Sequence, residues 1–394
     1  MTPGLILTFN AGSSTIKLGL YETGAEGPRL LARGSMDFRD EPFEIRLKQD
    51  GKQFAYPLSA DPNDLEAVLQ QGFLALSGHF DMSRLAVIGH RVVHGGDIFT
   101  APARIDDRIL DRIEALAALA PLHQPQCLRL IRTMRRLYPD AMQVASFDTA
   151  FHATMDPVAR RFAIPRALHD QGIKRYGFHG LSYAFIAQEL PGLGLAPDAR
   201  VVAAHLGSGA SLCAMQGGVS RDSSMGFSTI DGIPMATRSG ALDPGVILHL
   251  MGPMGRSLGQ VEQMLYRESG LLGVSGFEAD SRELMESDRP EATEAIDLFC
   301  LRIAGETARL AVTIGGLDAL IFTAGIGEHQ PGIRTRVADH LGWLGLRLDA
   351  AANGTNARRI SAPDSGVQAF VVPTDEERII AQEAAAFLGA AGPA

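Results

Sequence analysis

The sequence predicts an α/β protein built from two similar domains. The chain has 394 residues, more than one hydrophobic core normally supports, so about two domains are expected. It opens with an apolar strand, a turn of small polar residues at 10–15 and a second apolar strand, and a similar hairpin returns at 200–215. Strands and helices alternate after each hairpin. This repetition indicates a duplicated domain, with a boundary near 148–157.

The composition is typical of a globular protein and excludes several kinds of partner. Hydrophobic residues make up 46% of the chain and charged residues 21%, and the net charge is -9. Nucleic acid is not expected to bind, because the arginines form no run on an acidic chain. No segment has the roughly 18 to 20 apolar residues that would span a membrane, and the start lacks a signal-peptide pattern. Three separated cysteines in apolar surroundings indicate buried thiols. We expect a cytoplasmic protein.

Local patterns predict the individual elements. Alternation around Asp50-Gly51 predicts a second hairpin, and apolar residues at helical spacing predict the helices that follow. In the first half we expect strands at 5–9, 16–20, 43–47, 53–56, 85–88 and 142–146, and helices at 64–76, 107–118 and 125–138. In the second half we expect strands at 200–206, 212–215, 319–323 and 369–372, a loop at 324–328, and helices at 291–314 and 376–388.

The turn of the first hairpin carries groups that suit an anion. Gly12 and three neighbouring hydroxyl residues offer backbone N–H and O–H donors, and Lys17 adds a charge. The chain has no Walker phosphate loop, because its only Gly-Lys pair, Gly51-Lys52, is followed by Gln53. The turn predicts a phosphate contact, with an ordinary hairpin turn as the alternative.

Two isolated arginines stand in tight glycine-containing segments, one in each half. Arg91 lies within Gly89–Gly96, and Arg238 lies in Thr-Arg-Ser-Gly. Two such cations would suit a phosphoryl group, and ordinary surface ion pairs are the alternative. His90 and His94 have the spacing of a helical zinc pair, but the surrounding valines and glycines favour a strand and a turn, where the two rings do not converge.

Other candidate residues lie at the ends of predicted elements. Asp148 directly follows a buried strand, a position that suits catalysis or metal binding and equally suits a helix cap. His123 stands between two prolines, and His179 stands between glycine and aromatic residues. The Gly-Ile-Gly-Glu segment at Gly325 suits a nucleotide contact, although it lacks a full dinucleotide fingerprint. The carboxylates after Thr374 are most simply N-terminal helix charges, and magnesium is the other reading.

Taken in order, these segments resemble the acetate kinase family, part of the group that contains sugar kinases, Hsp70 and actin. The resemblance covers essentially the whole chain, and eight motifs in the same order are specific where one would be weak. The motifs are Asn-Ala-Gly-Ser-Ser at Asn10, Gly-His-Arg-Val-Val-His-Gly-Gly at Gly89, Pro-Leu-His at Pro121, Phe-Asp-Thr-Ala-Phe-His at Phe147, Tyr-Gly-Phe-His-Gly at Tyr176, His-Leu-Gly at His205, Thr-Arg-Ser-Gly at Thr237 and Gly-Ile-Gly-Glu at Gly325.

The resemblance implies two RNase H-like (actin-like ATPase) domains with a catalytic cleft between them. The implied domains are 1–149 with about 378–394, and 150–377, the latter binding the nucleotide. The implied reaction is reversible, Mg²⁺-dependent transfer of a phosphoryl group from ATP to acetate, giving acetyl phosphate and ADP. Direct in-line transfer between two arginine clamps fits the physics, because phosphoryl transfer depends on positioning and charge neutralisation. Family members are homodimers.

The resemblance also implies a role for each matching residue. Asp148 is the family's essential carboxylate; because acetate is already ionised at pH 7, we expect it to position metal-bound water and not to act as a base. The catalytic residues are Asp148, Arg91, His179, Arg238 and His123; the acyl pocket is Val93, Leu122 and Phe178; the magnesium ligands are Asn10 and Glu376. The nucleotide and its phosphates are expected at Ser13, Lys17, His205, Leu206, Gly207, Ser208, Gly209, Asp280, Ser281, Arg282, Gly325, Ile326, Gly327, Glu328 and His329.

Three positions depart from the family's pattern and leave the acyl chain open. Ser208 replaces an Asn, Thr229 a Pro that borders the acyl pocket, and Ala241 an Asp. Propionate or butyrate are alternative substrates, because one methylene in an apolar pocket changes binding by only about 1 to 3 kcal/mol. A nucleotide-dependent switch without kinase activity is the alternative of another class. Retention of both arginines and of Asp148 favours the kinase.

Overall fold

The computed structural model describes residues 4–12, 15–121 and 123–390. It divides into two compact units, Met1–Phe151 with Asp375–Ala394 (unit 1) and His152–Thr374 (unit 2). The boundaries expected from the sequence were 149/150 and 377/378. The last helix belongs to the same unit as the first strands, so the chain leaves unit 1 once and returns to it at its end.

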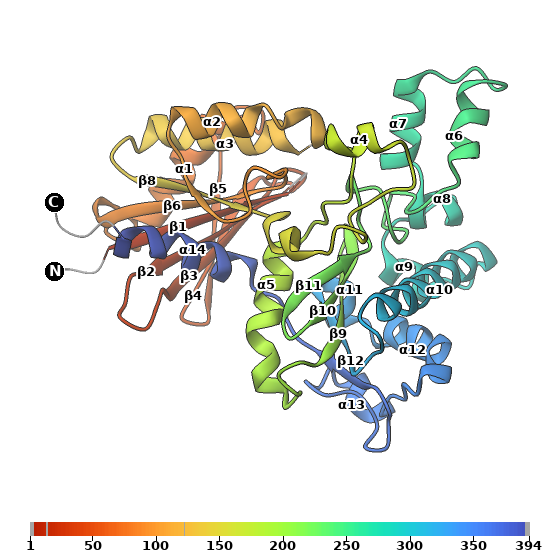
Figure 1. Ribbon diagram of the computed structural model, residues 1–394. Helices are drawn as coiled ribbons and strands as arrows, with labels where there is room; N and C mark the ends of the chain where they lie inside the picture. Colours follow the sequence, from red (N-terminus) through yellow and green to blue (C-terminus); the bar gives the residue numbers. More distant parts are fainter. Residues whose placement is uncertain (1–3, 13–14, 122, 391–394) are drawn as a thin grey trace. The chain divides into compact units, whose positions relative to one another are not determined.

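Unit 1 is built on one sheet of eight strands in the order β5-β4-β3-β2-β1-β6-β8-β7 (Figure 1). β1 pairs antiparallel with β2 and parallel with β6, and β6 pairs parallel with β8. The carboxyl ends of β1, β6 and β8 therefore share one edge of the sheet. The strands are β1 Leu5–Ala11, β2 Thr15–Glu22, β3 Arg29–Asp37, β4 Glu44–Gln49, β5 Lys52–Pro57, β6 Leu85–Val92, β7 Ala103–Arg104 and β8 Met142–Phe147.

Helices cover both faces of this sheet, because β1 is apolar on both sides. Leu5, Leu7 and Phe9 share a buried core with α1 (Leu65–Ser77) and α3 (Gln124–Leu137). Ile6 points to the opposite face and packs in a core with α14 (Glu376–Ala390). A further core lies beside α2 (Asp107–Glu114). These four apolar residues of β1 thus each pack against a helix on their own face of the sheet.

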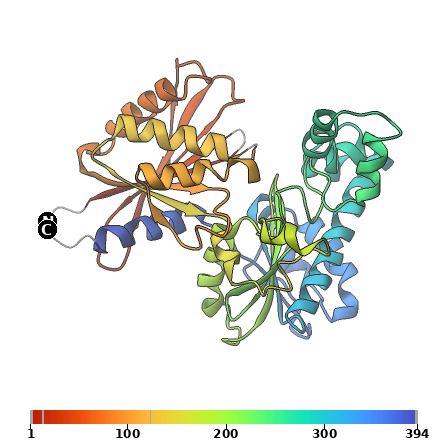
Figure 2. The ribbon, with the colours of Figure 1, turned by 45° about the horizontal axis from the view of Figure 1, so that its top comes forward.

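Unit 2 is built on a five-stranded sheet in the order β11-β10-β9-β12-β13. The long helix α10 packs against β9, β10 and β11 of this sheet (Figure 2). The strands are β9 Arg200–Leu206, β10 Ala210–Gln216, β11 Val219–Ser223, β12 Ala319–Thr323 and β13 Gln368–Val371. The helices are α4 Arg166–Asp170, α5 Gly180–Glu189, α6 Pro244–Met251, α7 Leu258–Arg267, α8 Gly270–Ser275, α9 Ser281–Glu286, α10 Pro290–Thr313, α11 Ala324–His329, α12 Pro331–His340 and α13 Ala350–Gly354.

Most of the expected elements are confirmed, and one is wrong. The hairpins formed by β1 and β2, β4 and β5, and β9 and β10 are all present. The segment 324–328 was expected to be a loop, but it forms the short helix α11. The sequence does not predict this helix, because two of its six residues are glycines, which have a low helix propensity. No helix in the described ranges has the length and apolar character needed to cross a membrane.

A close contact between β6 and α14 gives a test of this packing. A Cβ on Gly89 would lie 2.5 Å from Ile380 Cγ2 and 3.3 Å from the Ile380 carbonyl oxygen. We expect Gly89→Ala to lower the free energy of unfolding by about 1 to 3 kcal/mol, because the helix must move off the sheet. Urea denaturation measures this. Gly389→Ala on the same helix is the control, since its Cβ would meet nothing within 4 Å; equal stability of the two variants would contradict the packing.

Candidate active site

Three of the predicted residues of unit 1 lie at the carboxyl edge of neighbouring parallel strands. Asn10 is near the end of β1, Arg91 is near the end of β6, and Asp148 directly follows β8. The Asp148 N–H donates to the Val92 carbonyl at 3.0 Å, which continues the ladder past the end of β8. The three side chains therefore come together because their strands are adjacent and parallel.

Arg91 and Asp148 form a buried, forked ion pair. Arg91 Nη2 donates to Asp148 Oδ2 at 2.6 Å, and its Nε lies 3.1 Å from both carboxylate oxygens. The Asp148 side chain is 0% exposed and the Arg91 side chain 15%. Burial alone would lower the pKa of Arg91, but the Asp148 carboxylate raises it, and the net shift is upward. Arg91 is thus a permanent cation with a fixed direction.

Asn10 links this pair to two carboxylates at the start of α14. Its Oδ1 accepts from Arg91 Nη1 at 3.0 Å, while its Nδ2 donates to Glu376 Oε2 at 2.6 Å and to Glu377 Oε1 at 2.8 Å. Burial raises the pKa of Glu377, the neighbouring Glu376 charge raises it further, and Asn10 and Lys17 oppose the shift. Lys17 is the cross-strand partner of Asn10 in the β1–β2 hairpin.

The oxygen-rich character of this edge suits a hard divalent cation. Within the described ranges there is no ready-made group of three or more His, Cys, Asp or Glu side chains for a metal. Mg²⁺ does not need one, because it binds through one or two carboxylates and keeps several waters. Glu376 offers carboxylate oxygens of this type, and Asn10 offers one amide oxygen, which in this structure accepts from Arg91 Nη1; both residues are buried. The donor set fits Mg²⁺ better than zinc, which prefers His and Cys.

His90 and His94 have protein partners and do not form a zinc pair. His90 Nε2 lies 2.6 Å from Gln143 Oε1, and His94 Nδ1 accepts the Gly96 N–H at 3.0 Å. Both rings are buried, and burial lowers the pKa of each to about 4. They are neutral at pH 7 and support the backbone around Arg91.

In unit 2, two histidines stack beside the bare turn between β9 and β10. His179 adopts a left-handed backbone (φ 56°) immediately before α5, and its Nδ1 bonds the Ser211 hydroxyl at 2.8 Å. His205, at the end of β9, bonds the Ser182 hydroxyl at 2.8 Å. The two ring centroids are 4.3 Å apart. The hydroxyl bonds fix both rings through Nδ1, so both Nε2 atoms point away from these partners.

The turn itself is surrounded by the other predicted groups of unit 2. A Cβ on Gly209 would lie 3.6 Å from His179 Nε2 and 3.7 Å from Arg238 Nη1. A Cβ on Gly207 would lie 3.7 Å from His205 Nε2 and 3.8 Å from the Ala324 side chain. Two imidazoles, a guanidinium and the start of α11 therefore all border this turn.

The remaining nucleotide candidates meet around α11. Glu328 Oε1 accepts the backbone N–H groups of Ala324 (2.8 Å) and Thr374 (3.1 Å). Gln330 Nε2 donates to the Ser281 hydroxyl at 2.7 Å, which joins the segment after α11 to the start of α9. Asp280 and Arg282 form an exposed ion pair at that start. Gly325–His329 and Asp280–Arg282 are thus neighbours in unit 2.

The predicted acyl-pocket residues are divided between the units. Val93 (unit 1) and Phe178 (unit 2) are both buried. His123 immediately precedes α3 in unit 1. Ser13 and Leu122 lie outside the described residues. Leu206 is buried at the end of β9, and the Ser208 carbonyl accepts the Ala236 N–H at 3.4 Å.

The sequence reasoning missed three residues that hold the site. Glu377 was considered together with the other carboxylates after Thr374 but was not named as a site residue, although it accepts a hydrogen bond from Asn10 at 2.8 Å, beside that of Glu376 at 2.6 Å. Ser211 bonds both His179 and, at 2.6 Å, Tyr183. His152 bonds the Phe178 carbonyl at 2.9 Å, next to His179. Glu377 had a signal in its place beside Glu376, and His152 in the motif that begins at Phe147. Ser211 had none, because its contacts join residues far apart in the chain.

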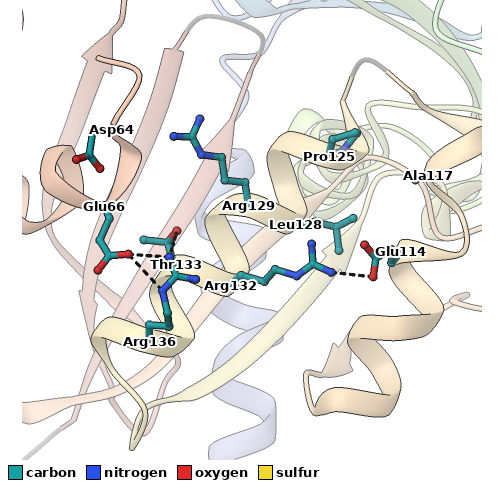
Figure 3. A pocket seen from close by; sticks show the side chains of 10 residues that line it. All are labelled: Asp64, Glu66, Glu114, Ala117, Pro125, Leu128, Arg129, Arg132, Thr133 and Arg136. Atoms are coloured by element: carbon teal, nitrogen blue, oxygen red, sulfur yellow. Dashed lines mark hydrogen bonds and ion pairs between the residues drawn. The ribbon is translucent and has the colours of Figure 1, made fainter. Parts of the chain in front are cut away.

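A separate hollow of about 420 Å³ lies between α1, α2 and α3 of unit 1 (Figure 3). It contains none of the predicted site residues. Its arginines already have partners: Arg132 pairs with Glu114, Arg136 pairs with Glu66, and Arg129 donates to the Asn63 carbonyl. These are exposed ion pairs of small energetic value, so the hollow gives no reason to move the site.

Comparison with known proteins assigns the family. The model of the Acetokinase family matches residues 5–382. The chain belongs to this family. It is 46% identical to the acetate kinase of Rhodopseudomonas palustris (strain TIE-1), over 96% of this chain and 97% of that protein.

Solved structures of the family confirm the fold. A propionate kinase from Francisella tularensis is similar with a TM-score of 0.88 at 34% identity, covering 97% of this chain and 99% of that one. The acetate kinase of Porphyromonas gingivalis is similar with a TM-score of 0.85 at 32% identity, covering 98% of this chain and 100% of that one. The expected α/β architecture of duplicated actin-like ATPase domains is therefore confirmed.

The buried histidines predict an acid-dependent loss of stability. Burial lowers the pKa of His90, His94 and His152 to about 4, whereas an unfolded histidine titrates near 6.5. As the pH falls, the histidines of the unfolded chain take up protons first. The stability that the neutral, buried histidines contribute is therefore complete above about pH 6.5 and is lost as the pH falls towards 4. Between these two pH values we expect each histidine to lower the free energy of unfolding by about 1.4 kcal/mol per pH unit.

Urea unfolding between pH 7.5 and 5 measures this slope. His90→Gln should make it shallower, because one buried ring no longer titrates. His340→Gln, at an exposed position, should leave it unchanged. A wild-type stability that does not change across this range would contradict the account.

Proposed function

We propose that this protein transfers a phosphoryl group from ATP to acetate, reversibly and with Mg²⁺, giving acetyl phosphate and ADP. The observation that carries the proposal is the buried Arg91–Asp148 pair joined through Asn10 to Glu376, in a chain of the acetokinase family. This arrangement provides a fixed cation beside oxygen ligands for a metal. Such a combination suits transfer of a charged phosphoryl group.

In this proposal, the arginines and histidines offset the negative charge of the reacting groups. Arg91 and Arg238 bind the carboxylate and the transferring phosphoryl group. His123 and His179 donate hydrogen bonds to the oxygens of the phosphoryl group. The Ser211 hydroxyl bonds His179 Nδ1 at 2.8 Å and so fixes the orientation of the ring. Direct in-line transfer needs no covalent intermediate on the protein.

The sequence led us to expect that Asp148 positions metal-bound water, but in this proposal it positions Arg91 instead. Acetate is ionised at pH 7, so no base is needed to activate it. The Asp148 carboxylate already accepts three close Arg91 contacts, which aims the guanidinium. Asn10 and Glu376 would hold Mg²⁺ together with water and phosphate oxygens. The metal, when bound, neutralises the charge of the ATP phosphates.

The nucleotide would bind in unit 2, along the segments His205–Gly209, Asp280–Arg282 and Gly325–His329. The support is their mutual proximity around the β9–β10 turn and α11. Ser13 and Lys17 would contact the phosphates from unit 1. Val93, Leu122 and Phe178 would surround the acyl chain. Propionate and butyrate remain alternative substrates, and the Francisella tularensis relative is described as a propionate kinase.

We also propose that the protein is a cytoplasmic homodimer. Residues 244–258 of unit 2, which contain α6 and the first residue of α7 (the α6 segment), support a dimer, because several of their apolar side chains have little cover within their own unit. Leu248 is 71% exposed, Leu258 69% and Met254 54%. An apolar helix of this kind normally packs against another surface. A second copy of this chain is the occupant that we propose.

An acyl-hydroxamate assay with ATP, Mg²⁺ and acetate, propionate or butyrate tests the reaction. We expect most product with acetate, and none without Mg²⁺. Arg91→Ala and Arg238→Ala should each lower kcat by about 10²-fold or more, because each removes charge stabilisation in the transition state. Arg135→Ala, which breaks an exposed ion pair with Asp107, is the control. If none of the three acids gave product, the non-kinase switch would be favoured. Near-normal turnover in either arginine variant would contradict the proposed kinase reaction.

Light scattering after size-exclusion chromatography tests the dimer. The wild-type protein should have the mass of two chains, and Leu248→Glu should shift it to one, because a charge would have to be buried at the interface. Val158→Glu is the control, since this exposed valine lies outside the α6 segment. A wild-type mass of one chain would contradict the proposal.

A further inference from the structure

Arg334 of α12 is a fully buried arginine whose hydrogen-bond partners are all neutral. Its side chain is 0% exposed, and in the described part of the chain no carboxylate pairs with it. Burial lowers the pKa of Arg334 to about 10, so it is still protonated at pH 7. A buried cation without an acidic partner is costly, and an apolar side chain of similar size would avoid that cost.

All five N–H donors of this guanidinium are used. Nε donates to Asn353 Oδ1 at 2.7 Å, and Nη2 donates to the Asn353 carbonyl at 2.8 Å and to Asn356 Oδ1 at 2.6 Å. Nη1 donates to the carbonyls of Gly327 and Glu328 at 2.8 and 3.1 Å. Five donors in a fixed plane match five acceptors, a geometry that lysine cannot reproduce.

Asn353 is itself held in place. Its Nδ2 donates to the Pro331 carbonyl and to Thr335 Oγ1, both at 3.0 Å. The Arg334 guanidinium therefore ties α11 to α13 through α12, which lies next to both of these helices in unit 2. Nε and Nη2 of Arg334 thus bind the anchored Asn353, while Nη1 binds carbonyls in the last turn of α11.

α11 needs such support because it cannot hold its own shape. It has six residues, two of them glycines, and it begins at Ala324 with a left-handed φ of 64°. A helix of this length is not stable without tertiary contacts. The Glu328 carboxylate fixes its first N–H, and Arg334 fixes its last carbonyls.

We propose that Arg334 is a positioning residue for the nucleotide, holding the backbone of Gly325–His329 in its binding conformation before ATP or ADP arrives. This inference rests on the proposed function, which assigns that segment to the nucleotide. A segment fixed in advance loses less entropy on binding. Arg334 lies among backbone and amide oxygens, so it acts on the nucleotide only through α11.

Calorimetric titration with ADP and MgCl₂ tests the inference without relying on activity. We expect Arg334→Met to weaken ADP binding by about tenfold, since small displacements of a positioning segment have effects up to about 10²-fold. The KM for ATP should rise similarly, while the KM for acetate stays within about twofold. Arg334→Lys keeps the charge without the fork and should remain weakened. Asn356→Gly removes one acceptor at a residue with φ 54°, which glycine tolerates, and should weaken ADP binding less.

Arg309→Gln is the matched control. Arg309 is an arginine of unit 2 that pairs with Asp222, and its loss should lower the melting temperature without changing ADP binding. A folded Arg334→Met protein with wild-type ADP affinity, or with an equal rise in the KM values for ATP and acetate, overturns the inference. If that variant does not fold, an unchanged affinity in Asn356→Gly overturns it. Wild-type protein that binds no ADP overturns the proposed function, and this inference with it.

Discussion

The ion pair between Arg91 and Asp148 is the interaction on which the candidate site of unit 1 depends. Asp148 has no exposed surface, so its charge is tolerable only because Arg91 lies against it. Arg91 in turn orients Asn10, and Asn10 orients Glu376 and Glu377. Removing either member of the pair would leave an uncompensated buried charge. The contacts of Asn10 with Glu376 and Glu377 would then no longer be fixed.

Unit 2 achieves fixed geometry by a different physical route. Its histidines are held by neutral hydroxyls, and its α11 segment is held by one carboxylate and one guanidinium at opposite ends. Glycines at 207 and 209 keep the β9–β10 turn open beside them. An ion pair thus fixes Arg91 in unit 1, whereas hydrogen bonds to neutral groups fix His179 and His205 in unit 2. Both arrangements fix polar groups before any ligand binds.

The sequence predicted ten of the thirteen strands in the described residues, because these strands carry clear local apolar patterns, and it missed β3, β7 and β11. Asp148 could be placed at the end of a strand from its neighbours alone. The partners of His179 could not be, because Ser211 lies on another strand and the contact exists only after folding. α11 was missed because six residues with two glycines carry no helical period. Arg334 gave no signal either, since an arginine on a helix is most often exposed.

A double-mutant cycle on Arg91 and Asp148 tests the central claim most directly. The value of kcat/KM for acetate is measured in Arg91→Ala, in Asp148→Ala and in the double variant, with circular dichroism confirming that each is folded. If Asp148 acts by aiming Arg91, the double variant should be no slower than the slower single variant. Losses that multiply would show that the two residues act independently, and would contradict the account.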